Sequence, residues 1–144
     1  MFNKETEYAL RSLVYIQAQN FNGRKPGVEE IASATEAPRH FTAKILHRLV
    51  RNGFLLSLKG KGGGFFLDDE KSSTPLLDIV SAVGGSKLFT GCVFGLKQCN
   101  CDTPCPMHDR YASIRDSLQE LLSSETILTL AEKYPAYQLA GSSK

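Results

Sequence analysis

All four cysteines of this chain lie in one short stretch, CVFGLKQCNCDTPCPMH, at residues 92–108. They stand at Cys92, Cys99, Cys101 and Cys105. Turn-forming residues separate them, and the apolar positions are too broken for a core strand or helix. His108 follows the last cysteine by three positions. Clustered thiols with a nearby imidazole on a turn-rich loop are typical of a metal-ligand loop.

The composition favours a cytoplasmic protein with no membrane partner. Its 144 residues suffice for one hydrophobic core, and 42% hydrophobic and 22% charged residues are ordinary for a globular domain. No apolar run approaches the roughly 20 residues of a spanning helix. The N-terminal residues of the chain carry charges where a signal peptide would be apolar. In a reducing cytosol, clustered cysteines more often bind metals or take part in redox chemistry than form structural disulfides.

Basic residues are concentrated in the first half of the chain. Residues 1–66 hold ten Lys/Arg and five Asp/Glu, or +5, whereas residues 67–144 hold seven and ten, or −3. Residues 37–67 contain no acid at all. Their basic residues are Arg39, Lys44, Arg48, Arg51, Lys59 and Lys61. Such a block predicts binding to a polyanion. The alternative, a solvated helix face, usually mixes both signs.

The basic block is predicted to include a helix-turn-helix. Helical spacing predicts a first helix over residues 4–19 and a short second helix that opens near Val28. A third helix should run from Arg39 to about Asn52, with Pro38 at its first position and Gly53 just past its end. One face of this third helix is apolar. The opposite face presents His40, Ala43, Lys44, His47 and Arg51.

Residues 54–67, FLLSLKGKGGGFFL, predict a β-hairpin with a flexible basic tip. Glycines allow the close backbone approach that a phosphate-binding tip requires. The alternative of a nucleotide-binding loop lacks the Gly-Lys-Ser/Thr ending. A helix-turn-helix followed by a basic hairpin is a winged helix, in which Lys59 and Lys61 would lie along the DNA backbone or a minor groove.

The second half of the chain predicts a dimerisation helix. A polar connector at 68–73 and a helix from Thr74 to Val83 precede the cysteines. Residues 109–123 carry an apolar stripe that a twofold partner could cover, although packing on its own domain is the alternative. We therefore expect a mainly α fold with a small β-hairpin. Its predicted parts are a winged helix-turn-helix domain at 1–85, a cysteine-rich loop at 86–108, dimerisation and short C-terminal helices at 109–134 and a tail at 135–144.

Several motifs together resemble the Rrf family of bacterial transcription regulators, which includes the IscR, NsrR, RirA and CymR types. They are Tyr8-Ala9-Leu10-Arg11, KILHRLVRNGFL at 44–55, SLKGKGGGFFL at 57–67 and C-x6-C-x5-C-P-x-H at 92–108. The resemblance covers roughly residues 1–132. It implies a homodimer that binds palindromic double-stranded DNA, responds to iron, redox state or nitric oxide, and is not an enzyme.

In cluster-bearing members of this family, three cysteines and one other residue hold an iron–sulfur cluster of two or four irons. The resemblance assigns the three cysteine positions to Cys92, Cys99 and Cys105. Cys101 has no counterpart in the usual pattern, so it could be a spare thiol or an alternative ligand. His108 matches the fourth ligand of the IscR type. Glu7 matches an acidic ligand that NsrR-type proteins supply from the partner subunit, although a favourable charge in the first turn of a helix explains Glu7 equally well.

The expected DNA contacts are inferred from the pattern of basic residues and from the family resemblance together. Arg39, His40 and Lys44 would lie at the start of the recognition helix, and Lys59 and Lys61 on the wing. His40 matches a base-reading position of the family, and Lys59 stands where the family more often has arginine.

Three other interpretations of the cysteines stay open. Cys99 could form a reversible disulfide with Cys101 or Cys105, which would make a cluster-free thiol switch, and CymR-type members work through a protein partner without a cluster. A zinc site at Cys99, Cys101, Cys105 and His108 is chemically competent but matches no common finger spacing. A Cys105–His108 nucleophile and base would define an enzyme, but no oxyanion loop accompanies the pair.

Overall fold

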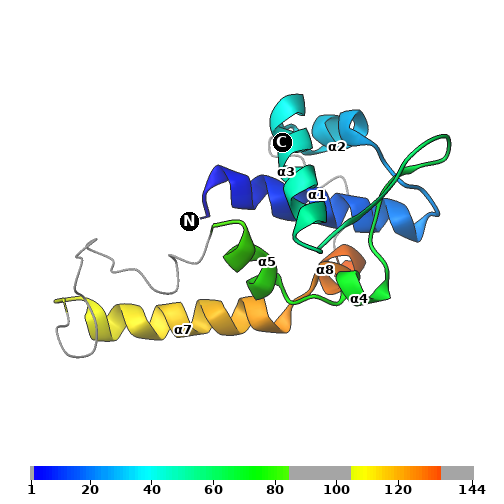
Figure 1. The fold of residues 1–144 in the computed structure, drawn as a ribbon. Coiled ribbons are helices and arrows are strands. Elements are labelled where there is room, and N and C mark those ends of the chain that lie inside the picture. The colour runs from blue at the N-terminus through cyan, green and yellow to red at the C-terminus, as the bar shows by residue number, and fades with distance from the viewer. Residues whose placement is uncertain (1, 85–104, 134–144) are drawn as a thin grey trace.

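The computed structural model describes residues 2–84 and 105–133. In chain order its elements are α1 (Lys4–Phe21), α2 (Val28–Thr35), α3 (Arg39–Arg51), β1 (Leu56–Leu58), β2 (Gly64–Phe66), α4 (Asp69–Ser72), α5 (Leu76–Ala82), α7 (His108–Ser124) and α8 (Ile127–Lys133). Figure 1 shows α1 through the middle of the molecule, with α2 and α3 on one side and α5, α4 and α8 on the other. In the described ranges, no helix is long and apolar enough to cross a membrane.

The core forms around α1, whose apolar positions recur at helical spacing. Leu13 and Ile16 of α1 are fully buried and belong to one hydrophobic cluster with side chains from the other helices and the hairpin. Its most buried members beyond α1 are Ile31, Leu46, Leu49, Leu55, Ile79, Val80, Val83 and Ile127. Because Ile127 lies on α8, the C-terminal helix completes the core that the N-terminal helices begin.

Local signals set the ends of the helix-turn-helix. Asn3 caps α1 by accepting a 2.8 Å hydrogen bond from the backbone N–H of Thr6. Glu36 ends α2 in the left-handed conformation, with φ of 56°. The prediction that Pro38 occupies the first position of the third helix was wrong by one residue. Pro38 has ψ of 137°, which is extended, and it precedes α3 as its N-cap.

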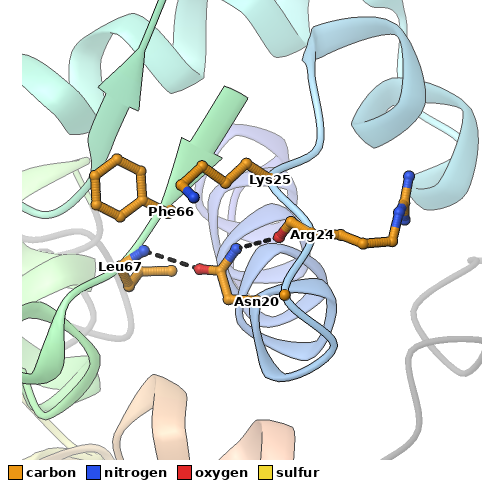
Figure 2. A pocket seen from close by; sticks show the side chains of 6 residues that line it. Asn20, Arg24, Lys25, Phe66 and Leu67 are labelled. Atoms are coloured by element: carbon orange, nitrogen blue, oxygen red, sulfur yellow. Dashed lines mark hydrogen bonds between the residues drawn. The ribbon is translucent and has the colours of Figure 1, made fainter. Parts of the chain in front are cut away.

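The hairpin is anchored to the turn between α1 and α2. β1 and β2 pair antiparallel, with Ser57 opposite Phe65. Phe65 donates its backbone N–H to the Pro26 carbonyl at 2.9 Å, and Leu67 donates to Oδ1 of Asn20 at 2.9 Å (Figure 2). The backbone approaches closely at Gly64, because a Cβ there would stand 2.1 Å from the Lys25 carbonyl oxygen. These contacts fix the base of the wing against the helix-turn-helix.

The polar connector predicted at 68–73 contains a helical turn, α4. Asp68 caps it by accepting a 2.9 Å hydrogen bond from the backbone N–H of Lys71. The prediction of a polar connector did not include this helical turn. A capping aspartate followed by Asp69 and Glu70 in the first turn favours a helix start, and this local signal outweighs the absence of an apolar stripe.

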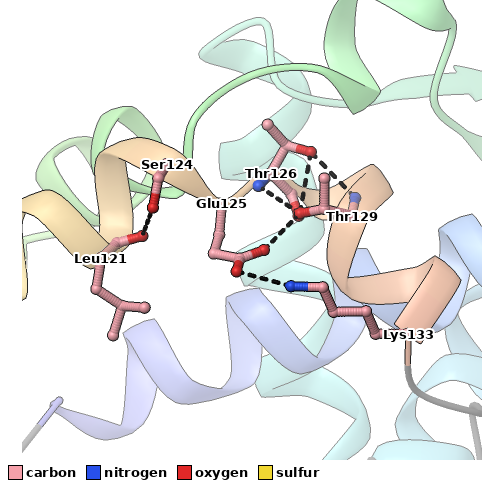
Figure 3. A network of polar contacts seen from close by, with 6 residues as sticks. All are labelled: Leu121, Ser124, Glu125, Thr126, Thr129 and Lys133. Atoms are coloured by element: carbon pink, nitrogen blue, oxygen red, sulfur yellow. Dashed lines mark hydrogen bonds and ion pairs between the residues drawn. The ribbon is translucent and has the colours of Figure 1, made fainter.

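A polar junction fixes α7 and α8 to the domain (Figure 3). Thr126 and Thr129 cap α8 reciprocally, with backbone-to-hydroxyl distances of 2.9 and 3.1 Å. Glu125 accepts from Thr129 at 2.7 Å and from Nζ of Lys133 at 2.9 Å, and these two hydrogen bonds lower the pKa of the Glu125 carboxyl. Its carbonyl also accepts the N–H of Leu76 at 2.9 Å. The C-terminal end of α7 is thereby held beside α5.

Tyr15, Arg24 and Glu30 form a charged network between α1, the following turn and α2. The Tyr15 hydroxyl donates a hydrogen bond to Glu30 at 2.6 Å. Nη1 and Nη2 of Arg24 donate to the two oxygens of the same carboxylate, each at 2.8 Å. Burial, followed by the hydrogen bond to Glu30, raises the pKa of Tyr15 to about 12. The hydrogen bonds from Arg24, and then from Tyr15, lower the pKa of Glu30 although burial opposes them.

This network predicts a pH-dependent contribution to stability. A carboxyl whose pKa is lowered by folding stabilises the protein above its unfolded pKa, and this contribution disappears as the pH falls through the lower folded value. The urea midpoint of Glu30→Gln should therefore lie below that of the wild type at pH 7. The difference should shrink as the pH falls below the ordinary value of 4.5. The control Glu70→Gln, at an exposed position of α4, should change the midpoint little, and a Glu30→Gln deficit that did not shrink at all as the pH fell below 4.5 would contradict the assignment.

Candidate functional site

The outer face of α3 is polar and exposed, whereas its inner face is buried. Ile45, Leu46 and Leu49 point into the core, with at most 3% exposure. The exposed positions recur every three or four residues along the helix, as one face requires. After Arg39, which is also exposed at the start of the helix, they are His40, Lys44, His47 and Arg51. Two of the three expected contacts on this helix, His40 and Lys44, therefore lie side by side on the accessible surface.

Arg39, the third of these residues, begins α3 and contacts α2. Its Nε donates to Oε2 of Glu29 at 3.0 Å, and both side chains remain well exposed. No sequence pattern indicates Glu29 as a partner of Arg39, since it lies ten positions upstream and outside the basic block. Only the turn between the two helices brings the pair together.

The wing places two basic residues at its tip. Lys59 and Lys61 lie between β1 and β2 and are exposed. Gly60 and Gly62 alternate with these lysines and have φ of 91° and 80°, a conformation that glycine adopts without steric cost. The tip therefore turns tightly while it carries two cations.

One cation of the basic block turns inward. Arg48 pairs with Glu5 of α1 and donates from Nη2 to the Ala82 carbonyl at the end of α5, at 3.3 Å. Its side chain is about one-third exposed, at 37%. Arg48 therefore links α3 to α1 and α5, and the outward-facing charge of the block is smaller than its composition indicates.

The structure describes part of the predicted cysteine site. Cys105 is buried, with 8% exposure, just before α7, and its carbonyl accepts the N–H of His108 at 3.0 Å. This turn brings Cys105 and His108 to the head of one helix. Glu7 lies in the first turn of α1, 3.6 Å from the Lys4 ammonium. Cys92, Cys99 and Cys101 lie outside the described residues, and within residues 2–84 and 105–133 no three metal-binding side chains come together.

The turn after α1 borders a hollow of about 210 Å³ beside the wing, lined by Asn20, Gly23, Arg24, Lys25, Phe66 and Leu67 (Figure 2). The polar atoms of Asn20 are already used within the fold, since its amide donates to the Arg24 carbonyl and accepts from Leu67. The Lys25 ammonium lies 5.4 Å from the centre of the Phe66 ring. The side chains of Asn20, Lys25 and Phe66 at this hollow thus take part in contacts that join the wing to the turn after α1.

A recognition-type helix with an exposed basic face and a basic hairpin on the same domain define a winged helix-turn-helix protein. The Rrf2 family, described as an iron-dependent transcriptional regulator, matches residues 2–133. The chain therefore belongs to the Rrf2 family. It is a DNA-binding transcriptional regulator and not an enzyme.

Relatives and solved structures agree with this assignment. A protein of Aquifex aeolicus described as an HTH-type transcriptional regulator is 31% identical over 132 residues, which is 90% of each chain. CymR, the global cysteine regulator of B. subtilis, superposes with a TM-score of 0.73 at 20% identity, covering 93% of this chain and 98% of its own. IscR of T. potens gives 0.69 at 20% identity, with 94% and 90% covered. These likenesses confirm the predicted fold class.

Proposed function

We propose that this regulator is a cytoplasmic homodimeric repressor that binds a palindromic operator and senses iron, redox state or nitric oxide through an iron–sulfur cluster. The observation that carries the proposal is the position of Cys105. It is buried at the head of α7, and the cysteine segment joins the DNA-binding domain to this helix. Loss or oxidation of a cluster at the cysteines would therefore act on the connection between the DNA-binding domain and α7.

The projecting helix α7 supports a homodimer. Met107, Ile114 and Leu121 stand seven residues apart and are 42%, 62% and 53% exposed. In Figure 1, α7 extends away from the rest of the molecule, and Leu122 near its C-terminal end is buried against the domain. A seven-residue apolar repeat on an exposed helix is the pattern of a helix that pairs with another helix. A second copy provides that partner and a twofold axis that matches a palindrome.

The donor chemistry at the head of α7 fits an iron–sulfur cluster. Cys92, Cys99 and Cys105 would supply thiolates, which are the soft ligands that such clusters require, and His108 would supply the fourth ligand. Glu7 of the partner subunit is the alternative fourth ligand, and Cys101 the spare thiol. When bound, the cluster supplies an oxidant- and nitric-oxide-sensitive centre. The turn between Cys105 and His108 would hold two of its ligands together.

The decisive experiment measures iron and acid-labile sulfide per protomer on protein purified without oxygen. Near-stoichiometric iron and sulfide support the cluster, and their ratio with the visible spectrum separates two-iron from four-iron forms. Operator affinity is then compared between cluster-loaded and cluster-free protein, and equal affinity would contradict the sensing role. Transcription from an operator-bearing promoter in vitro tests repression.

A cluster-free regulator is the second candidate. It is favoured by the likeness to CymR, whose fold this chain shares with a TM-score of 0.73. In this case a disulfide between Cys99 and Cys101 or Cys105, or a protein partner, would change DNA binding. Absence of iron and sulfide after attempted reconstitution would favour this candidate.

We assign DNA contacts to Arg39, His40 and Lys44 on α3 and to Lys59 and Lys61 on the wing. Arginine at the start of the recognition helix can read guanine edges, whereas the lysines supply salt-dependent contacts with phosphates. The free exposure of both wing lysines supports their part in this assignment.

Removal of the two wing lysines should lower the salt dependence of DNA binding. Each lysine that neutralises a phosphate contributes about 0.9 to the slope of log affinity against log salt, so Lys59→Ala with Lys61→Ala should reduce the slope by roughly 2. Fluorescence anisotropy with a labelled duplex at several salt concentrations measures it. The control Lys71→Ala, which removes a cation from α4, should leave the slope unchanged. An unchanged slope in the double variant would remove the wing from the interface.

A further inference from the structure

We propose that Glu29 is a specificity-determining positioning residue for DNA recognition, because it holds Arg39 in the orientation that reads a base. The inference rests on the proposed DNA contact of Arg39 and adds an acidic residue of α2 to the recognition apparatus. Neither the basic pattern nor the family assignment points to this residue.

The geometry of the contact supports this role. Glu29 is the second residue of α2 and Arg39 the first of α3, so the pair bridges the two helices of the helix-turn-helix. The contact uses Nε of Arg39, which donates to Oε2 of Glu29 at 3.0 Å. Among the described residues, the Nη nitrogens of Arg39 have no hydrogen-bond partner. The carboxylate thus engages one edge of the guanidinium and leaves both Nη nitrogens for another acceptor.

Both free Nη nitrogens of Arg39 suit the recognition of a guanine base. A guanine edge presents two acceptors, O6 and N7, to a planar guanidinium that donates two hydrogen bonds. A flexible arginine at a helix start can equally bind a phosphate, which carries no sequence information. A carboxylate beside it limits the rotation of the guanidinium and also repels phosphates. Glu29 should therefore weaken non-specific binding and favour binding at the correct base.

The ion pair between Arg39 and Glu29 should contribute little to the stability of the fold. The side chains of Arg39 and Glu29 are 61% and 79% exposed, and exposed ion pairs contribute little to folding. Glu29 therefore adds an exposed negative charge beside a residue of the acid-free block at 37–67. An acid retained at the edge of a DNA-binding surface weakens general affinity for DNA, which is the expected cost of a specificity device.

The test begins with selection of duplexes from a random-sequence pool by the wild-type protein. Fluorescence anisotropy at fixed salt then measures the affinity for the selected duplex and for a scrambled duplex. The proteins compared are the wild type, Glu29→Gln, Arg39→Lys, the double variant and the control Glu70→Gln. Glu70 is an exposed acid of the same domain, on α4. Urea unfolding verifies that each variant is folded.

We expect Glu29→Gln to raise the affinity for the scrambled duplex by about threefold and to lower the ratio of selected to scrambled affinity by roughly five- to tenfold. Glu70→Gln should leave this ratio within about twofold of the wild type. In the Arg39→Lys background, which keeps the charge but lacks the planar guanidinium, Glu29→Gln should change the ratio little.

Two results would overturn the inference while the proposed function stands. If Glu29→Gln raised both affinities by the same factor, Glu29 would act through its charge alone. If Glu70→Gln lowered the ratio as much as Glu29→Gln, the position of the acid would not matter. A wild-type protein that enriched no common sequence would instead reject sequence-specific binding, and the inference with it.

Discussion

Replacement of Cys105 by serine should abolish most of the cluster binding that we propose, with iron and acid-labile sulfide falling by roughly tenfold or more. A serine hydroxyl is a poor substitute for a thiolate as an iron ligand. Cys105 is buried beside the start of α7, so its loss would also leave His108 as the one proposed ligand at the head of this helix. Iron and sulfide per protomer, measured after anaerobic reconstitution, check the expectation.

Cys101→Ser is the matched control for this experiment. It removes one thiol from the same stretch, and the family resemblance leaves position 101 outside the ligand set. The control should therefore keep its iron and sulfide. If both variants lost the cluster equally, the assignment of three ligands and one spare thiol would be wrong. If Cys105→Ser kept normal iron and sulfide, Cys105 would not be a ligand.

Replacement of Ile114 by aspartate should separate the proposed dimer into monomers. Ile114 is the most exposed large apolar residue of α7 and lies midway between Met107 and Leu121 in the seven-residue repeat. A charge at the centre of a helix–helix interface is desolvated without a partner, which costs several kcal/mol. Affinity for a palindromic duplex should fall by roughly 100-fold, because two linked sites gain about that factor over one. Sedimentation velocity and anisotropy measure the two effects.

Because Ile114 is exposed in the single chain, its replacement should change dimerisation without unfolding the monomer. With 62% of the side chain accessible, the substitution should leave the urea midpoint of the monomer unchanged. Gln119→Asp adds the same charge at an exposed polar position of the same helix and should leave the dimer intact. A dimeric Ile114→Asp protein with unchanged DNA affinity would show that another surface forms the dimer.

Periodicity and helix signals predicted most of the fold. The apolar spacing of α1 and α3, Gly53 after α3 and the glycine-rich wing each express a local preference that the folded protein keeps. The capped turn of α4 also has a local signal in Asp68, but its four residues are too short for periodicity to detect. Position 38 was misplaced by one residue because proline suits both the N-cap and the first turn of a helix.

The contacts between distant segments could not be predicted in the same way. The charge pattern counted Arg48 in the basic block that was expected to bind a polyanion, whereas the structure pairs it with Glu5, which lies 43 positions away. The pairing of Arg39 with Glu29 likewise depends on the angle between two helices. A side chain on the border between the buried and exposed faces of a helix can turn either way, and only the packing of neighbouring helices decides its direction.

The return of the chain at α8 determines how the proposed sensory segment is connected to the rest of the fold. α8 follows α7 in sequence, yet Ile127 is fully buried in the core that α1 begins, and Thr126 forms a β-bridge with Pro75. The cysteine segment and α7 are therefore an insertion within one folding unit, rather than a module joined to a finished domain. A different sensing segment could therefore be inserted between α5 and α8 in place of the cysteine segment and α7. A simple fusion after residue 85 would leave the host domain without the helix that completes its core.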